Sequence, residues 1–426
     1  MKEERKMHRR KNIGAGIGLV LIILIVAYMF SPLPKREPLK EKVSRGEYLV
    51  SFINEKDNAF HDYLFAVRLY GGRKEELKDE LKNLYFDKEI TKVSKEMKEY
   101  VKENEPAINV IRKAIAKKNC VVPEVTGSND LIPYLSKCRS LARIMVTEGK
   151  IREIDGDHKG AYQDYLDIMR FGGDISKGGV LINGLVSIAM DSTAISSMQS
   201  GLKKADAKTL EMVVDGLKEI EDNFVPYSKV LEVERKVLLN FAKHVTRKRI
   251  NLKELIVMGG GKLEGNLLYK IKINAFWLYV MFNKNKMIRN MEDYTQKMIE
   301  SADKPVYENE AKEFEENIPK DLISQILLHA FSRAKIRYAN NYANLRGTRI
   351  RAAVELFRIR HKRMPSNLSE LVTDGIIDEI PIDPFSNKPF QYIDGKIYSI
   401  GQDFKDDRAS VKIEWGKNQN KGDIIF

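Results

Sequence analysis

An uncharged apolar run near the N-terminus constrains this chain more than any other feature. Residues 13–30 contain no charged side chain and consist of Ile, Leu, Val, Gly and Ala, ending in Tyr-Met-Phe. At about 1.5 Å per helical residue, such a segment nearly crosses a hydrocarbon layer of about 30 Å. Ser31 and Pro32 follow and are expected to end the helix. We therefore predict a transmembrane helix over 13–31.

The charges around this run predict its orientation. Lys and Arg side chains crowd residues 1–12, at Lys2, Arg5, Lys6, Arg9, Arg10 and Lys11. Basic flanks tend to remain in the cytoplasm, so we predict a cytoplasmic tail, one pass through the inner (cytoplasmic) membrane and a body outside the cytoplasm. A cleaved signal peptide is the alternative. Its apolar part is about 7–15 residues and ends in small residues, whereas this run is longer and ends in bulky ones.

The rest of the chain up to about residue 345 has the pattern of helices. Residues 32–45 are rich in Pro and charge and predict a linker. Over 46–345, apolar residues recur at steps of three and four, as in Leu141, Ile144 and Met145. Expected breaks include Gly172-Gly173-Asp174, Gly178-Gly179, Pro226 and Pro305, and expected helix N-caps are Asp130, Asp174 and Asp206.

One stretch of this body resembles a tetratricopeptide-type helix pair. A helix ending at Ile154 is followed by a Gly156-Asp157 turn and a second helix that begins with Ala161, Tyr165 and Leu166. A repeat at the family's period of about 34 residues is not visible, so a generic helical bundle fits equally. The body also resembles uncharacterised, membrane-anchored helical proteins of planctomycete type. If an array forms, its concave face is expected to bind a protein or peptide.

The charge balance bears on partners. The 73 Lys and Arg outnumber the 60 Asp and Glu, for a formal net charge of +13, which favours anionic neighbours. On a membrane, lipid headgroups and envelope polymers are nearer than nucleic acid, so we expect no nucleic acid. The basic run of Lys243 and 247–249 is either an anionic-lipid contact or a solvated helix end. The apolar segment 274–282 is too short to span a bilayer and is expected to form a buried core helix.

No catalytic or cofactor residue is predicted. The six histidines do not form His-Glu-x-x-His, and Gly-x-Ser-x-Gly is absent. Gly259-Gly260-Gly261-Lys262 lacks the spacing of a phosphate-binding loop. Cys120 and Cys138 do not form a Cys-x-x-Cys pair, and either a disulfide or two separate buried thiols fits the sequence.

The pattern changes over 346–426, where a small α+β module is expected. A last helix should end at His361, before Pro365, with a turn around Leu368 and Leu371 packing back on it. Two short antiparallel strands are expected on either side of a turn at Asp394-Gly395. Val411, Ile413 and Trp415 are expected to form a third strand.

The order of motifs over 346–416 resembles the C-terminal domain of the major pseudopilin of type II secretion systems. The segments that carry this resemblance are Met364-Pro365, Ile380-Pro381-Ile382-Asp383-Pro384-Phe385, Pro389-Phe390-Gln391-Tyr392 and Tyr398-Ser399-Ile400-Gly401-Gln402-Asp403. The resemblance implies calcium binding by Asp403, Asp406 and Asp407, whose oxygens suit that ion. A solvated acidic turn is the alternative. The family's N-terminal leader and its Phe-Thr-x-x-Glu motif are missing, so assembly into a pseudopilus is not expected.

These features together predict a non-enzymatic, single-pass envelope scaffold that binds another protein, with a link to type II secretion implied by the resemblance. Two alternatives stay open. One is an envelope enzyme that acts on a cell-wall or lipid polymer through carboxylates not identified in the sequence. The other is an electrostatic tether to anionic lipid or polymer.

Overall fold

The computed structural model describes residues 57–72, 74–77, 79–81, 92–123, 134–248, 267–321, 324–325, 328, 331–413 and 421–426. Helix makes up 68% of it, and the sheet has three short antiparallel strands, which confirms a mainly helical fold. In this described part no helix is long and apolar enough to cross a membrane. The predicted tail, anchor and linker over 1–45 lie outside it. The chain divides into two compact units, of which 48–237, 295–317 and 330–426 form the larger.

Helices of the larger unit alternate between two layers, as the contacts between them show. They are α2 (Ala59–Leu69), α4 (Lys95–Ile115), α5 (Tyr134–Ile154), α6 (His158–Ser176), α7 (Leu181–Gly201), α8 (Ala207–Asp222) and α14 (Phe331–His361). Helix α5 contacts both α6 and α7, and α6 contacts both α7 and α8. Helices α2, α5, α7 and α14 therefore form one layer, and α4, α6 and α8 form the other. Helix α14 packs on α7 in its own layer and on α8 in the opposite one.

The turn between α5 and α6 confirms the predicted helix pair. Helix α5 ends at Ile154, Gly156 adopts a φ of 88°, and Asp157 caps α6 by accepting a hydrogen bond from the Gly160 amide at 2.9 Å. The two helices approach closely because Gly149 has no side chain. A Cβ atom there would lie 2.5 Å from Cε1 of the Tyr165 ring, so that ring occupies the space of the missing side chain.

The predicted break at Gly172-Gly173-Asp174 is wrong, because α6 continues to Ser176. Glycine at 172 lets α7 pack closely, since a Cβ there would lie only 3.1 Å from Oγ of Ser187. Asp174 is not an N-cap but accepts hydrogen bonds from the Tyr63 hydroxyl at 2.6 Å and from Lys177 at 2.7 Å. The expected breaks at Gly178-Gly179, Pro226 and Pro305 are confirmed, as is the N-cap Asp206, whereas Asp130 lies outside the described residues.

The remaining helices are α9 (Tyr227–Lys248), α11 (Leu267–Ala302) and α12 (Glu310–Glu316), with short 3-10 turns at Glu75–Leu77 and Leu202–Lys204. Helix α11 contains the apolar segment 274–282. Among its described side chains, Val280 is buried, but Tyr279 and Phe282 are exposed, the latter at 73%. The expectation of a buried core helix is therefore wrong for these two aromatic residues. Side chains of 244–249 in the basic run lie outside the description.

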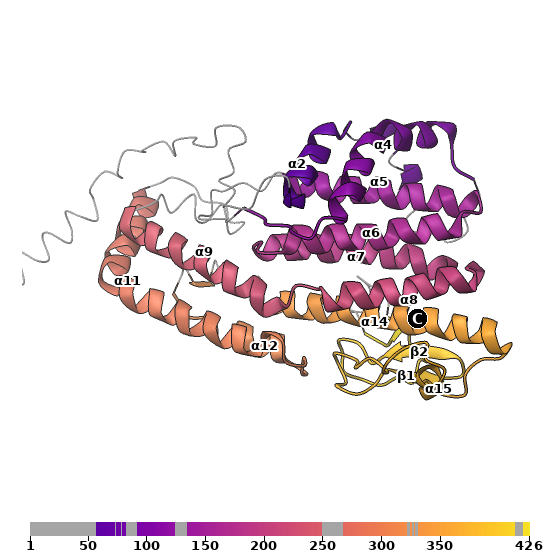
Figure 1. Cartoon of the computed structure of the whole chain (residues 1–426). Coiled ribbons are helices and arrows are strands. Elements are labelled where there is room, and N and C mark those ends of the chain that lie inside the picture. Colours follow the sequence, from indigo (N-terminus) through magenta and orange to yellow (C-terminus); the bar gives the residue numbers. More distant parts are fainter. Residues whose placement is uncertain are drawn as a thin grey trace, which may run out of the picture. The chain divides into compact units, whose positions relative to one another are not determined.

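The C-terminal module packs on the second half of α14 (Figure 1). It contains α15 (Ser369–Thr373) and the strands β1 (Gln391–Ile393), β2 (Lys396–Ser399) and β3 (Ile424–Ile425). Asp394 and Gly395 join β1 to β2 with φ values of 50° and 78°, as a two-residue hairpin turn requires. This confirms the helix end at His361 and the predicted hairpin.

The third strand is not the predicted one. Ile424 pairs with Ser399 and Ile425 with Tyr398, whereas Lys412 makes only an isolated bridge and Trp415 lies outside the described residues. The C-terminal residues take this place because Phe426 packs against α14 at Gly347. A Cβ atom on Gly347 would lie 2.2 Å from the Phe426 ring.

Cys120 and Cys138 are both free and buried, so the interpretation as separate thiols holds and that as a disulfide does not. Burial raises the pKa of both thiols, that of Cys138 to about 12. Uncharged thiols are poor nucleophiles, and we assign neither residue a chemical role.

Two glycine substitutions test the close packing of α5 on α6. We expect Gly149→Ala to lower the free energy of unfolding by about 1–3 kcal/mol, because Tyr165 must move. Gly173→Ala is the matched control, since its Cβ would meet nothing within 4 Å. It should leave stability unchanged or raise it by up to about 1 kcal/mol, through helix propensity. Chemical denaturation of both variants makes the comparison, and equal effects would contradict the packing argument.

Candidate binding groove

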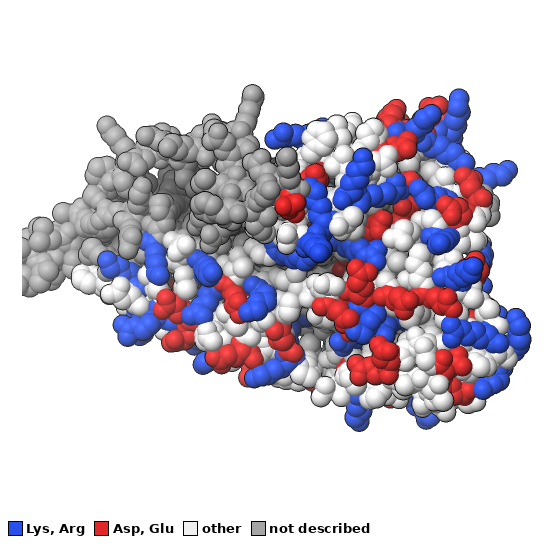
Figure 2. All heavy atoms as spheres, in the orientation of Figure 1, with Lys and Arg blue, Asp and Glu red and all other residues white. Residues whose placement is uncertain are grey.

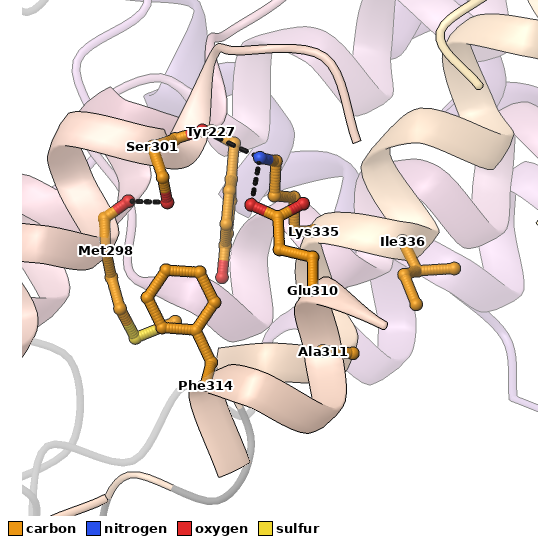
Figure 3. Close-up of a pocket in the computed structure, with 8 residues that line it drawn as sticks. All are labelled: Tyr227, Met298, Ser301, Glu310, Ala311, Phe314, Lys335 and Ile336. Carbon is orange, nitrogen blue, oxygen red and sulfur yellow. Dashed lines mark hydrogen bonds and ion pairs between the residues drawn. The ribbon is translucent and has the colours of Figure 1, made fainter. Parts of the chain in front are cut away.

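A small cavity beside α12 and α14 holds a buried ion pair (Figure 3). Lys335 donates to Glu310 at 2.6 Å and to the Ser301 carbonyl at 2.7 Å, while Met298 and Phe314 line the cavity. Its volume is about 10 Å³, close to the space of one water molecule. Desolvation raises the pKa of Glu310, an effect that the Lys335 ammonium opposes. The Lys335–Glu310 ion pair therefore joins α12 to α14, and the cavity beside it is too small for a ligand.

A much larger hollow of about 540 Å³ lies along the layer formed by α5, α7 and α14. We call it the polar groove. Each helix contributes several polar side chains, and α7 adds two isoleucines. Its lining consists of Arg139, Arg143, Ile188, Ser192, Thr193, Ile195, Ser196, Gln199, Arg337, Asn340, Asn341 and Asn344.

The spacing along each helix explains why these side chains meet. Arg337, Asn340, Asn341 and Asn344 follow steps of three and four, which place them on one face of α14. The α7 residues from Ile188 to Gln199 follow the same periodicity. Sequence analysis missed this site because a polar stripe on a helix is ordinarily a solvated surface. The available signal was three asparagines within 340–344, since Asn is a poor helix former.

The groove carries positive charge without an opposing carboxylate in its lining. Arg139 and Arg337 are exposed, and neither has an ion pair within the described part of the chain. Arg143 is half-buried and has a partner. The twelve lining residues include no Asp or Glu. Two guanidinium groups are therefore available to bind an anionic group.

A buried polar contact lies behind Asn340, Asn341 and Asn344, which we call the asparagine row. Asn341 donates from Nδ2 to Oδ2 of Asp191 at 2.8 Å, and the two residues are 3% and 1% exposed. Within the described residues, Oδ1 of Asp191, of Asn341 and of Asn340 has no hydrogen-bond partner. The burial raises the pKa of Asp191 to about 7, and the hydrogen bond from Asn341 only partly counters this rise. Two of these three unpartnered oxygens, on Asn340 and Asn341, belong to residues that line the groove.

The groove also contacts the C-terminal module. Asn340 donates from Nδ2 to Oε1 of Gln402 at 3.0 Å. Gln402 belongs to the motif that carries the pseudopilin resemblance. Gln199 in turn donates to Thr348 of α14 at 2.7 Å. The rim of the groove is therefore fixed partly by the module and partly by α14.

The predicted metal residues lie in the module's last loop, where the side chains of Asp403 and Asp406 accept hydrogen bonds from backbone amides. Asp403 accepts from the Gly422 amide at 2.8 Å, and Asp406 accepts from the Arg408 amide at 2.9 Å. The Asp407 amide donates to Asp423 at 3.4 Å. Among the described residues, no group of three or more His, Cys, Asp or Glu side chains is arranged to hold a metal ion.

Sequence reasoning missed two other aspartates that organise the module. Buried Asp383 accepts from the Ser399 hydroxyl at 2.6 Å and from the Phe385 amide at 3.2 Å, so it joins two of the motifs described above. Asp423 accepts from the Ala409 amide at 2.7 Å, and desolvation raises the pKa of Asp423 to about 6. These contacts give the motif residues a structural role.

Comparisons with known proteins add no relative: no family model, curated protein or solved structure matches this chain.

The buried Asp191 predicts a pH dependence of stability. Its pKa in the folded protein, about 7, exceeds the ordinary value of about 4. Between these values the folded state binds more protons than the unfolded state, so stability falls as pH rises. We expect the free energy of unfolding of the wild type, relative to Asp191→Asn, to fall by roughly 1.4 kcal/mol per pH unit over this range.

The measurement is urea denaturation of both proteins at several pH values. Asp378→Asn, at an exposed site, is the control and should track the wild type. A difference between wild type and Asp191→Asn that does not vary with pH would contradict the assignment.

Proposed function

We propose that this chain is a non-enzymatic envelope scaffold that binds a segment of another protein in the polar groove. In this proposal residues 13–31 anchor it in the inner membrane, and its body lies outside the cytoplasm. One observation carries the binding role: a hollow of about 540 Å³ is lined by two exposed arginines that have no ion pair in the described structure. A site that presents unpaired guanidinium groups beside buried acceptors favours a ligand with both charge and hydrogen-bond donors.

The layer arrangement supports this proposal. Helices that alternate between two layers are typical of tetratricopeptide-type pairs, and arrays of such pairs use one face to bind proteins or peptides. The polar groove lies along a single layer, made of α5, α7 and α14. Its residues come from three helices that are far apart in sequence, so the folded body is needed to form it.

The enzymatic alternative receives less support from this site. An acid–base mechanism needs a side chain such as His, Asp, Glu, Lys, Tyr or Cys that can exchange a proton with the substrate, and the groove lining contains none of these. Asp191 lies behind the lining, fully buried and bonded to Asn341. A tether to a broad polyanion also receives less support, because Lys and Arg are interspersed with Asp and Glu over the face drawn in Figure 2.

A link to type II secretion, and calcium binding by Asp403, Asp406 and Asp407, rest on the resemblance of the C-terminal motifs. If the resemblance extends to calcium, titration of the full chain with calcium should release heat, and the heat should vanish in the double variant Asp403→Ala, Asp407→Ala. Isothermal calorimetry makes this test. No heat from the wild type would leave Asp403 and Asp406 with the loop-ordering role described above.

The binding role is tested by isolating the full chain with its partners from native membranes after mild cross-linking. The double variant Arg139→Glu, Arg337→Glu should lose a partner that the wild type retains, because both arginines lie at the groove. Arg68→Glu is the matched control, since Arg68 is exposed on α2 and does not line the groove. Loss of the same partner from the control, or retention of every partner by the double variant, would contradict a role for the groove.

A further inference from the structure

We infer that the polar groove accepts an extended, acidic polypeptide segment, whose carboxylates pair with Arg139 and Arg337 and whose backbone amides bond to the asparagine row. The inference rests on the proposed function and adds the chemical class of the ligand. It is carried by the polar lining of the groove and by its buried, unpartnered acceptors.

The dimensions of the groove suit an extended chain. From Arg337 to Asn344 the helix rises about 10 Å, and from Ile188 to Gln199 about 16 Å, at 1.5 Å per residue. An extended peptide covers about 3.3 Å per residue, so these rows match roughly three to five of its residues. A segment of this length presents side chains to both sides of the strand, which lets it reach arginines on α5 and α14 together.

The hydrogen-bonding pattern favours a peptide backbone. Each backbone unit offers one N–H and one carbonyl, and an asparagine side chain offers the complementary acceptor and donor. Asn340 and Asn341 each have a buried Oδ1 without a partner in the described structure. Their Nδ2 groups are already used, by Gln402 and Asp191 respectively. These two oxygens are therefore the acceptors of the row that lack a donor, and because both are buried, a peptide N–H reaches them only when the side chain turns toward the groove.

The lining does not suit the other anionic polymers. Single-stranded nucleic acids bind largely by stacking bases on aromatic rings, and sugars commonly stack on such rings as well. The twelve lining residues include no Phe, Tyr, Trp or His. Ile188 and Ile195 supply apolar surface instead. An acidic peptide with some aliphatic side chains fits both the charge and the apolar part of the groove.

Carboxylates are the expected acidic groups. Arginine binds them through two parallel hydrogen bonds, and these are stronger than bonds between neutral groups. Arg139 and Arg337 lie on different helices, so a segment with acidic residues at more than one position can engage both. The lining itself includes no carboxylate, and Asp191 behind it is buried and hydrogen-bonded to Asn341.

Fluorescence anisotropy on the full chain in lipid nanodiscs tests this inference. The probe is a labelled nonapeptide of alternating Glu and small aliphatic residues, and its matched control replaces every Glu by Gln. We expect the acidic peptide to bind, and the Gln peptide to bind at least about tenfold more weakly, as loss of one good charged contact implies. Arg139→Gln, Arg337→Gln should show a similar loss, whereas Arg68→Gln should bind within about twofold of the wild type.

Two further probes separate the ligand classes. Oligogalacturonate carries carboxylates on a sugar backbone, and vesicles of phosphatidylglycerol and phosphatidylcholine carry phosphate headgroups. Neither should compete with the acidic peptide. Asn344→Ala leaves both arginines in place and should weaken binding of the acidic peptide. The salt dependence of that binding should stay unchanged, since it depends on the number of charged contacts. Circular dichroism of each variant verifies that it is folded.

Equal binding of the Glu and Gln peptides, or competition by oligogalacturonate or vesicles, would overturn the inference. This failure differs from failure of the proposed function. If a membrane partner still depends on Arg139 and Arg337 while the acidic peptide does not bind, the groove binds protein of another chemistry. If partner isolation is also insensitive to both arginines, the proposed function fails with the inference.

Discussion

The packing of α14 is the constraint on which the larger unit depends. Its first half completes the layer of α5 and α7 and supplies the asparagine row, and its second half carries the C-terminal module. Close contacts fix it at both places: Tyr338 occupies the space beside Gly184, and Phe426 occupies that beside Gly347. Arg346 joins the parts by bonding to Glu221 of α8 and to the Ile382 carbonyl, both at 2.7 Å. One helix thus aligns the groove with the module.

Because α14 belongs to both the groove and the C-terminal module, the module is less separable than its motifs suggest. The boundary expected between residues 345 and 346 falls inside α14, and a deletion there would remove part of the helix that supports the groove. The Asn340–Gln402 contact also connects the groove to the motif that carries the pseudopilin resemblance. Point variants such as those at Arg139 and Arg337 are therefore more informative about binding than truncation. A ligand that changes the position of Gln402 would therefore also change the hydrogen bonding of Asn340 in the groove.

Features that depend on neighbouring residues were readable from the sequence, and those that depend on distant ones were not. The Gly156-Asp157 turn, the helix end at His361 and the Asp394-Gly395 hairpin follow from local backbone preferences, and the structure confirms them. Two predictions were wrong because of distant contacts. Gly172 does not break α6, since α7 packs against it there. The third strand comes from residues 424–425, since Phe426 packs against α14 at Gly347. The polar groove needs three helices brought together by folding, so no local pattern could identify it.

The position of α14 in the chain also sets when the larger unit can be completed during synthesis. Its partners α7 and α8 end more than a hundred residues before it begins, so the faces that they pack against α14 stay uncovered until Phe331–His361 has been made. Contacts between such distant segments form slowly and leave hydrophobic surface open to misassembly. A nascent chain that stops before α14 therefore has neither a closed layer nor a groove. In the proposed function, a nascent chain therefore has no binding groove until α14 has been made.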